Sequence, residues 1–266
     1  MAEWQNIRTE VEERIALLTI DHPPVNSFNK QVVTELDEAI DELMADDKVK
    51  AIVITGGGTN AFVAGADIPE IKELLEHPDD GYGEAREFIE RGQSAHRKIE
   101  TATKPVIAAI NGFCLGGGLE LAMACHMRIC SDRARLGQPE INLGLIPGWG
   151  GTQRLPRIVG KAKALEMILT GDMVTAQEAY RIGLVNKVVP AGAILKEARG
   201  LARKIVSKSK FPIAATLRAV TDGLETTVDE GLEIEKEQFV GLADTEDIRE
   251  GVSAFLEKRQ PEFKDQ

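Results

Sequence analysis

Short apolar segments alternate with amphipathic ones along the first half of the chain, and this alternation limits the possible folds more than any other feature. The segment 29–47 places apolar residues at spacings of three and four, which predicts an amphipathic helix. Strands that alternate with helices pair in parallel, so the sequence predicts an α/β fold. The segments read as strands are short, apolar and rich in β-branched residues: RIALLTI (14–20), AIVIT (51–55) and PVIAAI (105–110).

The same alternation continues toward the C-terminus and then stops. A helix over about 84–101 precedes the third strand, and a glycine turn, a helix beginning near Gly117 and the strand MRIC (127–130) follow it. LVNKVV (184–189) resembles a last strand, and only helical patterns follow from about Lys196. We therefore expect residues 1–195 to form the core with the active site. Residues 196–266 should form a separate helical region that docks on another subunit.

Composition and charge exclude several classes of protein. The chain of 266 residues is 43% hydrophobic and 28% charged, as in ordinary globular proteins, and no apolar run is long enough to span a bilayer, so no membrane partner is expected. A net charge of -11 argues against a nucleic-acid partner, which would need a basic face. The acidic N-terminus and only three cysteines favour a reducing compartment. We expect a bacterial cytoplasmic protein or a mature organellar chain whose presequence was removed.

Three further motifs have simpler interpretations. TGGGTNA (55–61) matches a loosened dinucleotide fingerprint, but no helical pattern opens at its glycines, so it is read as a turn after a strand. CHMRIC (125–130) lacks the second ligand cluster that zinc needs, so no metal site is expected. Cys114 is better explained as a small core residue than as a nucleophile, because no histidine stands in a recognisable signature.

The helix that begins near Gly117, in NGFCLGGGLELAMAC (111–125), contains a single acidic residue, Glu120. Apolar neighbours cover every direction around this helix, so we expect it to be buried. A buried, unpaired carboxylate is destabilising unless it takes up a proton, and such groups are usually functional. The alternative is a buried salt bridge from Glu120 to Arg128 or Arg154.

A second carboxylate, Glu140, lies in the Gly/Pro-rich and mostly uncharged segment 136–151. It could merely complement the positive end of a helix. Two acids in apolar surroundings favour another interpretation, because paired carboxyls with different pKa values supply an acid and a base at neutral pH.

Two glycine turns could bring backbone N–H groups close to a ligand. Gly116, Gly117 and Gly118 lack side chains at a helix start, which is the layout of an oxyanion hole. FVAGADIPE (62–70) supplies a second turn, in which Asp67 precedes Ile68 as an expected helix N-cap. Ordinary helix capping by Asp67 is the alternative.

Three long motifs together resemble the crotonase (enoyl-CoA hydratase/isomerase) family, and in particular its short-chain hydratases. The resemblance extends from PPVNSFN (23–29) to GVSAFLEKRQPEFKD (251–265), so it covers nearly the whole chain. It implies a spiral of ββα units with a C-terminal helical region that forms homotrimers or homohexamers. The motifs that carry the resemblance are AFVAGADI (61–68), KPVIAAINGFCLGGGLELAMACHMRI (104–129) and GQPEINLGLIPGWGGTQRLPRIVG (137–160).

The family resemblance also implies a chemistry and assigns residues to it. The substrate would be an acyl-CoA thioester, with no cofactor beyond the coenzyme A of the substrate, and the expected pathway is fatty acid β-oxidation. Glu120 and Glu140 match the two catalytic glutamates, and the N–H groups of Ala66 and Gly117 match the oxyanion hole. The motifs place further residues at the substrate: Ala64, Asp67, Ile68, Gly116, Pro147 and Gly148.

Some positions depart from the common family pattern or stay open. Trp149 stands where smaller residues are frequent, and if it lines the acyl pocket it would limit chain length. We expect the phosphates of coenzyme A to meet basic residues near Lys258 and Lys264. A Δ3,Δ2-enoyl-CoA isomerase and a non-catalytic RNA-binding relative are the alternative functions. The glutamate pair favours hydration over the first, and the net charge disfavours the second.

Overall fold

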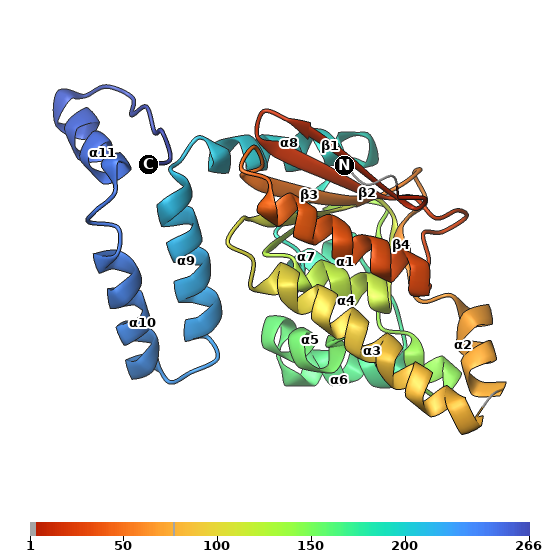
Figure 1. The fold of residues 1–266 in the computed structure, drawn as a ribbon. Helices are drawn as coiled ribbons and strands as arrows, with labels where there is room; N and C mark the ends of the chain where they lie inside the picture. Colours follow the sequence, from red (N-terminus) through yellow and green to blue (C-terminus); the bar gives the residue numbers. More distant parts are fainter. Residues whose placement is uncertain (1–3, 77) are drawn as a thin grey trace.

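The scaffold of the molecule is a pair of β-sheets covered by helices (Figure 1), in a computed structural model that describes residues 4–76 and 78–266. The larger sheet has six strands in the order β1-β2-β3-β5-β7-β10; β1 pairs antiparallel with β2, and the other neighbours pair in parallel. The predicted parallel α/β fold is therefore confirmed. The strands are β1 (Ile7–Glu12), β2 (Ile15–Ile20), β3 (Ala51–Gly56), β5 (Val106–Ile110), β7 (Met127–Ser131) and β10 (Lys187–Val189).

The smaller sheet has four short strands in the order β4-β6-β8-β9. Strands β4, β6 and β8 pair in parallel, and β9 pairs antiparallel with β8. Because these strands are two to four residues long, they show no alternating pattern, and the sequence analysis did not identify them. Their bounds are β4 (Ala61–Ala64), β6 (Phe113–Leu115), β8 (Arg135–Gly137) and β9 (Val174–Thr175).

Successive chain segments build the two sheets as a spiral. The pairs β3 and β4, β5 and β6, and β7 and β8 each place their first strand in the large sheet and their second in the small one. Helical structure follows each pair, so every turn of the spiral is a ββα unit. The end of each short strand and the start of the next helix consequently meet at one side of the molecule.

The helices pack around the sheets and extend beyond them. Helix α3 begins earlier than the expected helix at 84–101, and two short 3₁₀ helices, η1 and η2, interrupt loops. No helix in the described part of the chain is long and apolar enough to cross a membrane. The bounds are α1 (Lys30–Ala45), α2 (Ile68–Glu76), α3 (Pro78–Glu100), α4 (Gly117–Ala124), η1 (Glu140–Leu143), α5 (Gly151–Val159), α6 (Lys161–Thr170), α7 (Ala176–Arg181), η2 (Ala191–Ala193), α8 (Ile194–Val206), α9 (Lys210–Gly223), α10 (Val228–Val240) and α11 (Glu246–Glu257).

Helices cover both faces of the large sheet. Alternate residues along a strand point to opposite faces, so neighbouring residues of one strand pack into different clusters. Leu17 of β2 and Val53 of β3 belong to the cluster that contains Ile194, Ala198 and Ala202 of α8. The next residues along these strands pack into the main core with the apolar faces of α1 and α4. The expected boundary at residue 195 thus falls within the first turn of α8, and this helix packs on the sheet.

Helices α9, α10 and α11 form an arm that projects from the sheets (blue, on the left in Figure 1). Large apolar side chains are exposed along the arm, which is unusual for a surface that faces only water. Those exposed by more than half are Val220, Leu224, Val228, Leu232, Phe239, Val240, Val252, Phe255 and Leu256.

The C-terminal tail returns from the arm to the core and is anchored by Asp265. Its carboxylate accepts hydrogen bonds from Lys50 Nζ at 2.9 and 3.1 Å and from Arg14 Nη1 at 2.5 Å. It also accepts from the backbone N–H of Lys210 at the start of α9, at 2.6 Å. Asp247 of α11 accepts in turn from the N–H of Asp265 at 3.0 Å. The last residues thereby connect the arm to the edge of the large sheet.

Candidate active site

A cavity of about 320 Å³ opens between the ends of the short strands, the start of α4 and helices α2 and α3. It contains most of the residues that the sequence motifs placed at the substrate. The predicted site residues that line it are Ala64, Ala66, Ile68, Gly116, Gly117, Glu120, Glu140 and Gly148.

Close backbone approaches at the glycine turn allow α4 to enter the core. Gly116 has φ +52°, a region that side-chain-bearing residues rarely adopt. A Cβ on Gly118 would lie 2.2 Å from the carbonyl oxygen of Val63 in β4, so only glycine lets α4 pack this closely. All eight residues of α4 are buried, as predicted from its apolar surface. Glu120, in its first turn, is therefore held away from bulk water.

The Glu120 carboxylate is bound by backbone N–H groups rather than by a cation. Oε1 accepts from the N–H of Trp149 and from the N–H of Gly151, both at 2.7 Å. These two donors flank the start of α5, where the partial positive charge of a helix terminus favours an anion. Within the described residues Oε2 has no recorded partner, and Glu120 lines the cavity, so this oxygen is available to a ligand or water.

The alternative of a buried salt bridge to Glu120 is wrong for the residues that the structure describes. Arg128 donates to the carbonyl oxygens of Leu184 and Cys125, at 2.8 and 2.6 Å. Arg154 forms an ion pair with Glu100 at 3.0 Å instead. Burial raises the pKa of Glu120, and the two N–H donors only partly offset that shift.

Glu140 lies in η1 and lines the same cavity, with its Oε1 2.9 Å from where a Cβ on Gly116 would stand. Burial, together with the nearby charge of Glu120, raises the pKa of Glu140 from 4.5 to about 7. With its amide nitrogen facing the carboxylate, the fully buried Gln138 donates to Oε1 at 2.8 Å and to Oε2 at 3.1 Å. The cavity thus contains two carboxyls, and the pKa of Glu140 allows it to carry a proton at neutral pH.

Two backbone N–H groups also face this cavity without a protein partner. In the described part of the chain, no acceptor is recorded for the N–H of Ala66 or of Gly117, and both residues line the cavity. Ala66 forms a bridge to Phe28, whose hydrogen bonds use the carbonyl oxygen of Gly65 and the N–H of Asp67. That bridge fixes the Ala66 backbone while leaving its own N–H unpaired. Gly117 is the first residue of α4, where helical N–H groups have no intrahelical acceptor.

Two of the expected substrate-binding residues do not line the cavity. Asp67 Oδ1 accepts from the N–H of Glu70 at 3.4 Å, as a residue capping α2 does. Pro147 packs beside the start of α5, where its Cβ would lie 2.7 Å from a Cβ on Gly151. Neither side chain is part of the cavity surface.

Apart from Ile68 and Trp149, the large apolar residues that line the cavity were not predicted from the sequence. Most of the apolar lining comes from α2, α3 and the loop after η1. The only signal for these residues in the sequence is that they are large and apolar but stand in otherwise polar or loop segments. An apolar wall with a few convergent polar groups is typical of a small-molecule site. These residues are Ile71, Phe88, Ile89, Leu143, Leu145 and Ile146.

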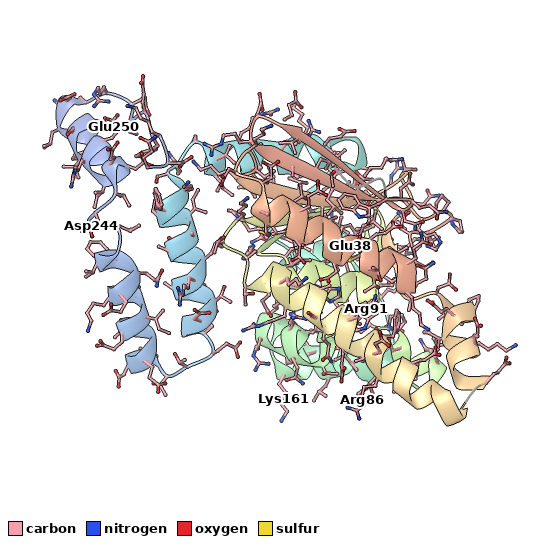
Figure 2. All side chains as sticks on the ribbon, in the orientation of Figure 1. Glu38, Arg86, Arg91, Lys161, Asp244 and Glu250 are labelled. Atoms are coloured by element: carbon pink, nitrogen blue, oxygen red, sulfur yellow. The ribbon has the colours of Figure 1, made fainter. Side chains whose placement is uncertain are left out.

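The basic residues expected at the phosphates of coenzyme A lie far from the cavity of the same chain. Lys258 ends α11, and Lys264 lies in the tail that follows it. Figure 2 shows Asp244 and Glu250 on this arm, on the opposite side of the molecule from α2. Within one chain, the structure does not bring these lysines and the glutamates together.

The other reactive side chains are structural. Cys114, Cys125 and Cys130 are free thiols in the core, and burial raises the pKa of each. Burial lowers the pKa of His96 to about 3, so this histidine beside Trp149 is neutral at physiological pH. Among the residues described, no group of three or more His, Cys, Asp or Glu side chains could hold a metal.

Known proteins resemble this chain over nearly its whole length. The family described as "Enoyl-CoA hydratase/isomerase" matches residues 10–266. The chain is 44% identical over 261 residues to a crotonyl-CoA hydratase of Syntrophomonas wolfei, and 43% identical over 261 residues to a short-chain-enoyl-CoA hydratase of Clostridium acetobutylicum, with 98% of both chains covered in each case.

A solved structure shows the same fold over the whole length of the chain. The crystal structure of an enoyl-CoA hydratase from Bacillus anthracis superposes with a TM-score of 0.92 at 35% identity. The match covers 98% of this chain and 100% of that one. The expected spiral of ββα units is confirmed, and the chain belongs to the enoyl-CoA hydratase/isomerase family.

Proposed function

We propose that the protein is an enoyl-CoA hydratase, which adds water across the double bond of a trans-2-enoyl-CoA to give a 3-hydroxyacyl-CoA. One observation carries the proposal: a buried carboxyl, Glu120, and a half-buried one, Glu140, both without cationic partners, line one cavity with the unpaired N–H groups of Ala66 and Gly117. The names of the relatives, crotonyl-CoA hydratase and short-chain-enoyl-CoA hydratase, agree with it.

The two N–H groups suit the charge that develops during hydration. As water adds to C3, negative charge moves to the thioester oxygen and an enolate forms. Donors fixed by the backbone, from Ala66 and Gly117, stabilise that charge without rearranging during the reaction. Loss of one such donor typically lowers the rate by about 10²- to 10³-fold.

The environments of the two carboxyls suggest different roles for them. Ionised Glu120 takes a proton from the attacking water as its oxygen bonds to C3. Protonated Glu140 gives a proton to C2. Because its pKa is about 7, a substantial fraction of Glu140 is protonated near neutral pH. The free Oε2 of Glu120 supports its role toward water, since Oε1 already accepts two hydrogen bonds. The two carboxyls titrate as a coupled pair.

Hydration requires only proton transfer and charge stabilisation. We therefore propose no cofactor beyond the coenzyme A that the substrate carries. The pathway we propose is fatty acid β-oxidation in the cytoplasm. The negative net charge disfavours the alternative of an RNA-binding protein.

The exposed apolar side chains of the arm support an assembly of several copies. Phe239, Phe255 and Leu256 are each exposed by more than 70%, although large apolar patches are normally covered. We propose that the arm packs against other copies in a homotrimer, or in a homohexamer made of two trimers. Lys258 and Lys264 would then reach a coenzyme A only from a neighbouring copy.

The first test is the loss of conjugated-thioester absorbance when the protein meets crotonyl-CoA. We expect rapid loss for the parent and a decrease of at least about 10²-fold for Glu120→Gln and for Glu140→Gln. Glu38→Gln, which alters an exposed carboxylate of α1 (Figure 2), is the matched control and should keep the parent rate. An inactive parent that converts a 3-enoyl-CoA would instead identify an isomerase.

A further inference from the structure

The indole of Trp149 occupies the inner end of the cavity. Its side chain lies among three rings, with centroid distances of 5.4 Å to Phe28, 5.1 Å to Phe88 and 5.6 Å to His96. Trp149 lines the cavity and is only 3% exposed. It is therefore a packed part of the wall and not a side chain that swings in solvent.

Two helices lack side chains where the indole lies. A Cβ on Gly92 of α3 would stand 2.3 Å from Cε2 of the indole, well inside any real contact distance. A Cβ on Gly117 of α4 would stand 2.8 Å from Cζ3 on the other ring edge. The indole is thus wedged between α3 and α4, and it needs glycine on both sides.

The backbone of Trp149 is fixed as firmly as its ring. Its N–H binds Glu120 Oε1 at 2.7 Å, and its carbonyl oxygen accepts from Arg154 Nη1 at 2.8 Å. The carbonyl also lies 3.3 Å from Nδ1 of His96. Backbone hydrogen bonds and ring packing together therefore hold the indole in one place in the wall.

The exposure of the lining residues defines a mouth and a floor. Ile146 and Leu143 are 68% and 56% exposed and form the mouth, whereas Trp149 and Phe88, at 3% and 8%, form the floor. The ring edge of Trp149 faces Gly117, whose N–H is assigned to the thioester oxygen. An acyl group held there meets the indole within a few carbons of its carbonyl.

We propose that Trp149, wedged against Gly92, is the floor that restricts this site to short acyl chains. The inference rests on the proposed function, because it takes the cavity to be the acyl site of a coenzyme A thioester. Nε1 of the indole is buried and has no hydrogen-bond partner among the described residues. The site consequently uses the bulk of the tryptophan and not its polar group.

The test compares the binding of butyryl-CoA and octanoyl-CoA by calorimetry, for the parent, Trp149→Ala and Trp149→Phe. The parent should bind butyryl-CoA in preference to octanoyl-CoA. Because one methylene in a hydrophobic pocket changes discrimination by about 10- to 200-fold, Trp149→Ala should shift the ratio toward octanoyl-CoA by at least about tenfold. Trp149→Phe should fall between the two. An unchanged ratio in a folded Trp149→Ala protein overturns the proposal.

A double-mutant cycle tests the wedge itself, with thermal stability in place of binding as its readout; if Trp149→Ala folds poorly, the binding ratio of Trp149→Phe still tests the floor. Gly92→Ala should lower the thermal midpoint of the parent, because its methyl group collides with the indole. In the Trp149→Ala background the same methyl group fills vacated space and should be neutral or stabilising. Equal destabilisation in both backgrounds contradicts the wedge.

The binding readout separates this inference from the proposed function. A parent that selects butyryl-CoA but hydrates no trans-2-enoyl-CoA refutes the hydratase and leaves the floor intact. A parent that hydrates crotonyl-CoA and binds both chain lengths equally refutes the floor and leaves the hydratase intact.

Discussion

The carboxyls of the cavity and the carboxylate of the C-terminal tail have different partners. In the cavity, Glu120 is held by two backbone N–H groups and Glu140 by the amide of Gln138. At the C-terminal tail, Asp265 is bound by the cations of Lys50 and Arg14. Burial raises the pKa of both glutamates, whereas at Asp265 the hydrogen bonds from Lys50, Lys210 and Arg14 outweigh burial and lower the pKa.

This difference shows how one kind of residue serves two purposes. A carboxylate paired with cations stays ionised and contributes to stability, so Asp265 fastens the tail to the sheet. A carboxyl without cationic partners can keep a raised pKa, as Glu120 and Glu140 do, and can exchange a proton with a substrate. Burial alone therefore does not identify a catalytic acid, and neither do neutral partners, because buried Glu35 of α1 accepts from the N–H groups of Gln5 and Asn6 without lining the cavity.

The largest effect that would test the contrast between the cavity and the tail is a loss of stability when Asp265 is replaced. Asp265→Ala leaves the Lys50 ammonium, which is only 5% exposed, without its carboxylate. Breaking a buried pair in this way typically costs about 3–5 kcal/mol of unfolding free energy. We expect urea denaturation at fixed protein concentration to show a loss of this order, while the hydration rate per folded protein changes little.

Asp265→Asn is the matched control for that variant. It keeps the shape and an acceptor oxygen, so it should restore part of the stability lost in Asp265→Ala. A loss below about 1 kcal/mol in Asp265→Ala would show that the two regions do not differ in the way their carboxylates are used.

A smaller effect is expected from Gln138, which acts on the reaction through Glu140. Gln138→Leu removes two N–H donors from the Glu140 carboxylate and thereby favours its protonated form. Hydrogen bonds to charged groups are worth about 1.5–3 kcal/mol, so the pKa of Glu140 should rise by about one unit or more. Because Glu140 acts as the acid, the alkaline limb of the kcat/KM profile should move to higher pH.

Gln138→Glu provides the contrast at this position. A carboxylate beside Glu140 also raises the pKa of Glu140, but it adds a further ionisation to the profile. If Gln138→Leu lowers the rate at every pH by the same factor, Gln138 merely supports the fold and does not tune Glu140.

The sequence predicted the catalytic region better than the tail. Glu120 was recognisable because an acidic residue interrupts an apolar helix. The sequence also predicted the strands of the large sheet except β1, whose residues IRTEVE are mostly polar. The donors that hold Glu120 lie 29 and 31 residues further along the chain, and nothing in the local sequence points to them. The strands of the small sheet were not predicted because they are only two to four residues long.

The tail shows the opposite limit of a sequence analysis. The final residues PEFKDQ are polar and resemble an exposed end, so no pattern indicates that Asp265 is buried. Its cationic partners, Arg14 and Lys50, precede it by 251 and 215 residues. Only the three-dimensional fold brings them together, since pairing over such separations depends on how the arm returns to the sheet.

The smallest effect expected concerns the stability of the catalytic region as pH changes. The pKa of Glu140 in the folded protein, about 7, exceeds the unfolded value of 4.5, so the folded state binds this proton more tightly. The proton on Glu140 therefore stabilises the folded state fully below about pH 4.5, and this stabilisation is lost as the pH rises through 7. Glu140→Gln removes this loss. The variant should therefore exceed the parent in unfolding free energy at pH 8 by about 1 kcal/mol, once partial exposure is allowed for, and by less at pH 5.

Asp265→Asn should show the reverse sign at pH 8, because the carboxylate it replaces is stabilising when ionised. Thermal unfolding of both variants at the two pH values measures this contrast, and equal signs would remove the distinction between the two regions.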